Sequence, residues 1–147
     1  MHFRFIWVGK TKNPHFAALH DDYAGRLGKF VRCQFDILRD GPDKQTEGKR
    51  ILEKLNPNSL VCLLDVQGKS LSSHDLAQQI ERWQNAGTRE IAFVIGGADG
   101  VSSEVADRAD DRVSLSFLTL THEMARVVLL EQLYRGYTIL KGFPYQK

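Results

Sequence analysis

Three glycines within five residues follow an apolar run near the middle of the chain. The segment begins at Phe93 and ends Gly96-Gly97-Ala98-Asp99-Gly100. Glycine lets a backbone approach a ligand closely and reach positive φ without steric cost, so backbone N–H groups here could bind an anion, adenine or ribose. The spacing matches neither G-x-G-x-x-G nor G-x-x-x-x-G-K-[ST], which excludes the usual dinucleotide and P-loop sites. A plain tight turn is the alternative.

A second candidate is the stretch from Leu115 to His122, in which hydroxyl side chains are interleaved with apolar ones. Its backbone amides and carbonyls could frame a flat, mostly apolar ligand such as adenine. The alternative is a buried strand that continues into a helix cap at Thr121.

Metal and nucleophile motifs are incomplete. His122-Glu123 would begin the zinc motif H-E-x-x-H, but its second histidine is replaced by Arg126, and the other histidines lack ligand spacing. The serines Ser102 and Ser103 do not lie in G-x-S-x-G. Two cysteines, Cys33 and Cys62, fall in predicted strands and are expected to be small core residues. We therefore expect no metal site.

Composition limits the class of protein. The chain has 147 residues, 42% hydrophobic and 26% charged, which favours one globular domain with its own core over disorder, collagen or a disulfide scaffold. No apolar run approaches the roughly 20 residues that cross a bilayer, and the N-terminal residues lack signal-peptide features. We expect a cytoplasmic protein with no membrane partner. A net charge of +2 permits an RNA partner without requiring one.

Apolar periodicity predicts alternating strands and helices. We expect strands near 2–9, 34–38, 60–64, 91–95, 112–116 and 137–140, and helices near 14–30, 43–55, 72–87, 102–109 and 121–134. This alternation predicts an α/β fold, a mostly parallel sheet with helices on both faces. Ligands bind such sheets outside the carboxyl ends of the strands, which brings together the segments 65–69, 96–100 and 115–121.

Together these motifs resemble one enzyme family. The two segments described above, followed by Arg126, Leu133-Tyr134-Arg135 and Pro144-Tyr145, are similar in order and spacing to the pseudouridine methyltransferase H family of the large ribosomal subunit, within the SPOUT class. The resemblance covers the whole chain.

The resemblance implies a single SPOUT domain with a C-terminal trefoil knot, acting as a homodimer with S-adenosylmethionine bound in the knot. The family methylates N3 of a pseudouridine in large-subunit (23S) rRNA on the assembled ribosome, without a metal. Carried over by position, the cofactor-binding residues would be Leu64, Gly97, Ser116, Phe117, Leu118, Thr119, Leu120 and Thr121.

N3 of the base carries a proton that must be lost, so a nearby cation or hydrogen-bond donor would stabilise the developing negative charge. Our catalytic candidates are Arg135 on the last helix, with Tyr145 and Lys147 in the tail. The alternatives are a surface cation at a helix C-terminus and a frayed tail.

The tail departs from the family, which usually has histidine where this chain has Gln146. Glutamine forms hydrogen bonds but cannot exchange a proton near neutral pH. We hypothesise that this position contacts RNA or positions the base and does not act as a base.

Two other functions stay open. A non-catalytic ribosome- or RNA-binding protein would keep the fold and have lost turnover through Gln146. A small-molecule enzyme would bind a nucleotide at the 96–100 loop, although no acid, base or nucleophile motif supports it. A broad apolar face on the last helix also suggests a partner surface, formed by Val127, Val128, Leu130, Leu133 and Tyr134.

Overall fold

All strands of the computed structural model, which describes residues 1–146, lie in one parallel sheet of order β2-β1-β4-β3-β5. The elements along the chain are β1 (His2–Val8), α1 (Pro14–Leu27), β2 (Arg32–Leu38), α2 (Lys44–Lys54), β3 (Leu60–Ser70), α3 (Ser73–Asn85), β4 (Glu90–Ile95), α4 (Ser103–Arg108), β5 (Asp111–Ser114) and α5 (His122–Lys141). The predicted α/β class is confirmed.

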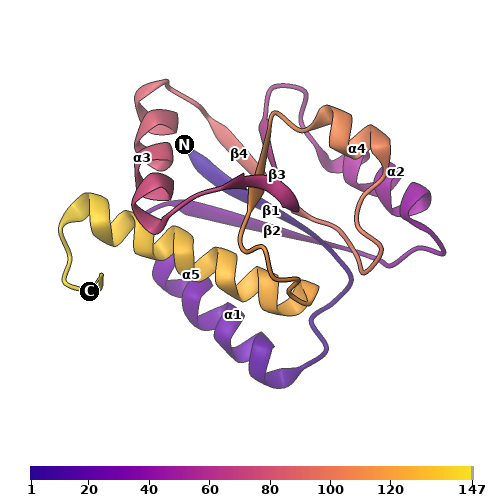
Figure 1. Ribbon diagram of the computed structural model, residues 1–147, viewed down its shortest axis with the longest axis horizontal. Coiled ribbons are helices and arrows are strands. Elements are labelled where there is room, and N and C mark those ends of the chain that lie inside the picture. The colour runs from indigo at the N-terminus through magenta and orange to yellow at the C-terminus, as the bar shows by residue number, and fades with distance from the viewer. Residues whose placement is uncertain (147) are drawn as a thin grey trace.

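Helices cover both faces of the sheet. The chain places α1, α3 and α5 on one face and α2 and α4 on the other (Figure 1). The central strands β1 and β4 are buried almost throughout, which explains their long apolar runs. Among residues 1–146, no helix combines the length and the apolar character needed to cross a membrane.

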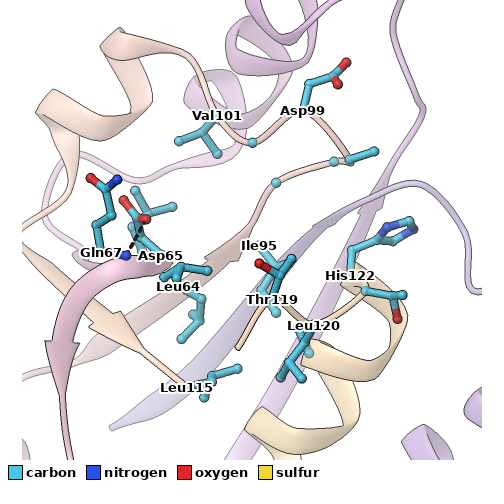
Figure 2. A pocket seen from close by; sticks show the side chains of 18 of the residues that line it. Leu64, Asp65, Gln67, Ile95, Asp99, Val101, Leu115, Thr119, Leu120 and His122 are labelled. Atoms are coloured by element: carbon cyan, nitrogen blue, oxygen red, sulfur yellow. Dashed lines mark hydrogen bonds between the residues drawn. The ribbon is translucent and has the colours of Figure 1, made fainter. Parts of the chain in front are cut away.

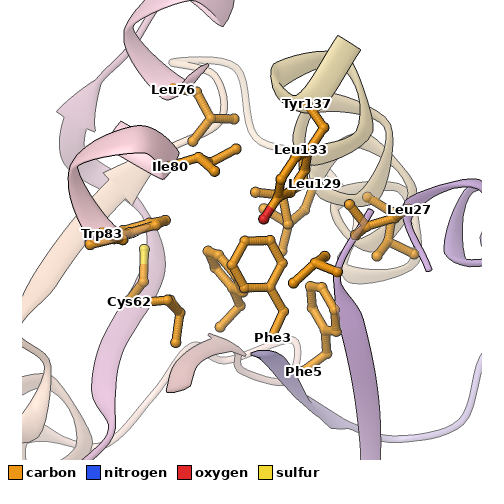
Figure 3. Close-up of a cluster of buried hydrophobic side chains, with 14 of the residues drawn as sticks. Phe3, Phe5, Leu27, Cys62, Leu76, Ile80, Trp83, Leu129, Leu133 and Tyr137 are labelled. Carbon is orange, nitrogen blue, oxygen red and sulfur yellow. The ribbon is translucent and has the colours of Figure 1, made fainter. Parts of the chain in front are cut away.

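Side-chain alternation along the strands builds two cores. In β1, Phe3, Phe5 and Trp7 point toward the larger core under α1, α3 and α5, whereas Ile6 and Val8 point toward the smaller core under α2 and α4. Figure 3 shows the larger core, where Phe3 packs edge-on against Phe93 at 5.1 Å between ring centroids.

The predicted strand near 137–140 is wrong, because α5 continues to Lys141. Tyr137 and Thr138 are buried, and a Cβ on Gly136 would lie 2.8 Å from Cδ1 of Ile80 on α3. Close packing on α3 thus holds these residues in a helix and overrides the strand propensity of the local sequence. The helix ends at Gly142, whose φ of 72° is left-handed.

The third strand is longer and less regular than predicted. β3 pairs with β5 through Leu64 and again from Lys69, with a register shift between them. The intervening residues bulge out of the ladder, and Gly68 permits this because a Cβ there would lie 2.7 Å from the backbone of Arg112. This bulge becomes one wall of the site described below.

The apolar face of α5 is explained in part within the chain. Val127, Leu130 and Leu133 are buried where α5 packs against both α1 and α3. Val128 and Tyr134 of the same face are only half-buried, so the partner surface stays a prediction. The homodimer and the trefoil knot stay predictions that rest on the resemblance.

Candidate functional site

A pocket of about 900 Å³ opens at the carboxyl ends of β3 and β4 (Figure 2). It is lined by the β3 bulge, by the loop after β4 and by the segment that joins β5 to α5. These are the three segments that the parallel-sheet argument brought together, and their convergence is confirmed. The sheet itself positions them, since parallel strands end at one edge.

Apolar side chains form most of the pocket wall. Leu64, Ile95, Leu115 and Leu120 gather in its centre, while polar groups lie around them (Figure 2). Asp65 is held by the bulge itself, since its Oδ1 accepts a hydrogen bond from the backbone N–H of Gln67 at 3.0 Å. A mostly apolar pocket with a few fixed polar groups suits a small organic cofactor.

The glycine loop after β4 is both a tight turn and a pocket wall. Gly100 donates from its backbone N–H to the carbonyl of Gly97 at 3.0 Å and has a φ of 82°. A Cβ on Gly96 would lie 2.8 Å from the carbonyl oxygen of Gly100, and one on Gly97 would lie 2.9 Å from Oε1 of Glu47. A side chain at Gly96 would therefore displace the backbone of the turn, whereas one at Gly97 would have to displace the flexible end of Glu47.

Hydroxyl groups shape the segment before α5. The Ser116 hydroxyl accepts from the N–H of Leu118 at 3.0 Å, and Thr121 caps the helix by accepting from the N–H of Met124 at 3.3 Å. The predicted cap at Thr121 is confirmed. Phe117 is absent from the pocket lining, and its side chain is 80% exposed. The other predicted cofactor-binding residues do line the pocket, namely Leu64, Gly97, Ser116, Leu118, Thr119, Leu120 and Thr121.

The predicted catalytic residues lie elsewhere. The first turn of α5 lines the pocket, whereas Arg135 lies toward the C-terminal end of this helix and Tyr145 lies in the tail that follows it. At the α-helical rise of about 1.5 Å per residue, Arg135 is roughly 20 Å along the axis from the pocket. Lys147 lies outside the described residues. One chain therefore does not bring the cofactor-binding and catalytic candidates together.

A compact cluster forms where the tail folds back on α5. Arg135 Nε donates to Oε1 of Glu131 at 2.9 Å, and its Nη1 donates to Oε1 of Gln146 at 2.7 Å. The Tyr145 hydroxyl donates to the same Glu131 oxygen at 3.1 Å, and the Arg135 guanidinium lies 4.9 Å from the Tyr145 ring centroid. The tail is thus docked on the helix.

Protonation in this cluster is fixed by its contacts. The hydrogen bond to Glu131 raises the pKa of Arg135, and burial together with Tyr23 and Glu131 raises the pKa of Tyr145. Tyr145 consequently stays protonated at neutral pH and serves as a hydrogen-bond donor. Sequence reasoning missed Glu131, although its position four residues before Arg135 was a usable signal for a helical ion pair.

Comparison with known proteins agrees with this architecture. A family model described as "Predicted SPOUT methyltransferase" matches residues 1–146. The chain is also 41% identical, over 149 aligned residues, to the ribosomal RNA large subunit methyltransferase H of Maridesulfovibrio salexigens, an alignment that covers 97% of this chain and 96% of the relative. The chain belongs to the methyltransferase H family of the SPOUT class.

Solved structures support the SPOUT fold. A probable methylase family protein from Haemophilus influenzae matches with a TM-score of 0.60 and 12% identity, covering 99% of this chain and 70% of that one. The SpoU methyltransferase AviRb from Streptomyces viridochromogenes, in complex with AdoMet, matches with a TM-score of 0.51 and 14% identity, covering 92% and 58%. At these identities the likeness concerns the fold alone.

Arg126 is one of the residues that resemble the methyltransferase H family, but it lies inside the fold and does not line the pocket. Its side chain is fully buried, and its guanidinium donates to the carbonyl of Val8 at 2.7 Å and to the hydroxyl of Thr11 at 3.1 Å. Burial lowers the pKa of Arg126. Nearby, Oε1 of Glu123 accepts from the backbone N–H groups of Lys12 and Asn13, which fixes the β1–α1 loop.

A smaller cavity of about 320 Å³ adjoins the pocket. The linings of the two share Gly97, Ala98, Asp99 and His122. The cavity also reaches the exposed lysines Lys10 and Lys12 of the β1–α1 loop. The rest of its lining is largely acidic, since five carboxylates accompany the two lysines, namely Asp40, Asp43, Glu47, Asp99 and Glu123.

The cysteines behave as core residues. Cys62 is buried in β3 and Cys33 is half-buried in β2. Burial raises the pKa of Cys33 to about 11 and that of Cys62 to about 12, so both thiols stay protonated and unreactive at neutral pH. The prediction for these two residues is confirmed.

Proposed function

We propose that the protein transfers a methyl group from S-adenosylmethionine to N3 of a pseudouridine in large-subunit (23S) rRNA on the assembled ribosome. The observation that carries this proposal is the pocket at the carboxyl ends of β3 and β4, walled by the three loops of a methyltransferase H chain. The name of the relative from Maridesulfovibrio salexigens and the AdoMet complex of AviRb support the choice of substrate and cofactor.

The residues present fit this cofactor. The apolar walls at Leu64, Leu115 and Leu120 match a flat adenine ring, and the glycine turn exposes backbone that hydroxyl-rich ribose can approach. Carboxylates at Asp65 and Asp99 can accept hydrogen bonds from its amino or hydroxyl groups. Phe117 would contribute through its backbone alone. When bound, S-adenosylmethionine supplies an electrophilic methyl group, which leaves the protein to align donor and acceptor.

The tail cluster, formed by Glu131, Arg135, Tyr145 and Gln146, supplies groups that can act on the RNA base that accepts the methyl group. Loss of the N3 proton places negative charge on the two carbonyl oxygens beside N3, where a cation or donor stabilises it. Arg135 is cationic, and the protonated Tyr145 hydroxyl would exchange its hydrogen bond to Glu131 for one to the base. Lys147 is the third candidate that the resemblance contributes.

A homodimer reconciles the two halves of the site. Since the cluster lies roughly 20 Å along α5 from the pocket of its own chain, we propose that the tail of one copy reaches the pocket of the other. A symmetric pair gives two such composite sites. Lys10 and Lys12, exposed beside the pocket, would contact RNA phosphates.

Gln146 favours one alternative, a non-catalytic RNA-binding protein with the same fold. The test is transfer of labelled methyl from S-adenosylmethionine to assembled ribosomes lacking the modification, with free rRNA alongside. Incorporation at a single large-subunit pseudouridine supports the proposed enzyme. No incorporation, with cofactor binding still measurable by calorimetry, indicates a folded pocket without turnover and rejects the proposed enzyme. Loss of both incorporation and cofactor binding favours the binding protein.

A further inference from the structure

One carboxylate holds the tail cluster together. Oε1 of Glu131 accepts from the Nε of Arg135 at 2.9 Å, from its Nη2 at 2.5 Å and from the Tyr145 hydroxyl at 3.1 Å. The Glu131 side chain is only 16% exposed. Because this single acceptor engages two N–H groups along one edge of the guanidinium, the rotation of Arg135 is fixed and its Nη1 points along a set direction.

That direction determines how Gln146 is oriented. Nη1 of Arg135 lies 2.7 Å from Oε1 of Gln146. Arginine carries donors and no acceptor, so only the oxygen of the glutamine amide can face it. The amide NH2 group of Gln146 is therefore turned away from Arg135. Gln146 as a whole is half-buried, so it is not enclosed by the protein.

We propose that Gln146 is a catalytic hydrogen-bond donor, whose amide NH2 contacts a carbonyl oxygen beside N3 of the target base, with Glu131 and Arg135 as positioning residues. This inference rests on the proposed function. In the step that it assists, the N3–H bond breaks, the proton passes to water and the electron pair stays on the ring. The negative charge spreads onto the carbonyl oxygens, where the amide donor stabilises it.

This arrangement explains why glutamine can stand where the family usually has histidine. A neutral imidazole has one acceptor nitrogen and one N–H donor. With the acceptor toward Arg135, its N–H would point outward like the glutamine NH2. Both side chains have one acceptor facing Arg135 and one donor facing outward. Neither has to gain or lose a proton in this role.

Substitutions at position 146 separate the donor from the contact that docks the tail. Gln146→Glu keeps an acceptor for Arg135 and loses the outward donor, whereas Gln146→His keeps both. We expect Gln146→Glu to lower kcat about 100-fold, as loss of one donor to a developing oxyanion does, with KM for the cofactor unchanged. Gln146→His should stay within about threefold of wild type because it keeps the donor. The substrate is large ribosomal subunits lacking the modification.

The positioning role is tested at Glu131. Glu131→Gln places a neutral amide against Arg135 and should lower kcat about tenfold without changing the calorimetric affinity for S-adenosylmethionine. The exposed Glu81 on α3 gives the matched control, and Glu81→Gln should leave kcat unchanged. Melting temperatures of all variants report whether the fold is intact.

Two results would overturn the inference while leaving the proposed function standing. One is a wild-type kcat for Gln146→Glu, which would show that no donor is needed. The other is a rate increase of about 100-fold or more for Gln146→His, which would show that a titrating base is needed at this position. Absence of methyl transfer by the wild-type protein would overturn the proposed function and this inference together.

Discussion

Arg126 of α5 donates a hydrogen bond from Nη2 to the backbone carbonyl of Val8, the last residue of β1, over 2.7 Å. This contact joins the helix that begins at the pocket to β1, an interior strand of the sheet. The guanidinium also lies 5.8 Å from the ring centroid of Trp7. Within residues 1–146 its Nε has no hydrogen-bond partner.

Truncation of Arg126 should therefore destabilise the chain. Arg126→Ala leaves a cavity and an unsatisfied Val8 carbonyl, and we expect a loss of about 2–4 kcal/mol in the free energy of unfolding. Arg126→Met fills the cavity without burying a charge and should lose less. Urea denaturation measures both. An equal loss in the two variants would show that packing volume is unimportant at this position.

The glycine turn predicts a sharp difference between two Gly→Ala substitutions. A Cβ on Gly96 would lie 2.7 Å from Cγ1 of Val101 and 2.8 Å from the Gly100 carbonyl, so Gly96→Ala must shift the turn that walls the pocket. We expect its affinity for S-adenosylmethionine, measured by calorimetry, to fall at least about tenfold because the backbone no longer fits.

Gly25 provides the control for that experiment. It lies within α1, and a Cβ added there would meet no other atom within 4 Å. Gly25→Ala should raise the free energy of unfolding by about 0.5–1 kcal/mol through helix propensity and leave cofactor affinity unchanged. Equal cofactor affinities for Gly96→Ala and Gly25→Ala would contradict the placement of the cofactor at the glycine turn.

The sequence predicted the position of the pocket, but not the helical state of residues 137–138 or the register of β3. Parallel strands must end at one edge, so the convergence of the segments 65–69, 96–100 and 115–121 could be predicted from the sequence alone. The helical state of Tyr137 and Thr138 could not, because it depends on close packing of Gly136 against Ile80. Register was equally hidden, since the bulge between Leu64 and Lys69 arises from pairing with β5.

Acid should weaken the fold through Glu90. Burial alone would raise the pKa of this carboxyl, but hydrogen bonds involving Ser59, His2 and Asn56 outweigh it and lower the pKa below the ordinary value of 4.5. A lowered folded-state pKa contributes stability above pH 4.5 that is lost as the pH falls through the folded value. Urea midpoints measured from pH 6 down to pH 3 should fall steeply below about pH 4.5.

The matched variant for this effect is Glu90→Gln, which cannot titrate. It should be less stable than wild type at pH 6, because the amide NH2 cannot replace both carboxylate acceptors, and its stability should change less between pH 4.5 and pH 3. Parallel pH profiles for the two proteins would assign the acid sensitivity to other carboxylates.

The composite site of the proposed homodimer can be tested by complementation. Gly96→Ala disables the pocket, and Arg135→Ala removes the guanidinium that orients Gln146 and stacks on Tyr145. Heterodimers of the two variants, purified through two different tags, contain one chain with an intact pocket and one with an intact tail. If the tail works in the partner's pocket, one of the two sites is complete, and methyl transfer should return to about half the wild-type rate. If each chain completes its own site, both sites are broken and the heterodimer should be as inactive as the separate variants.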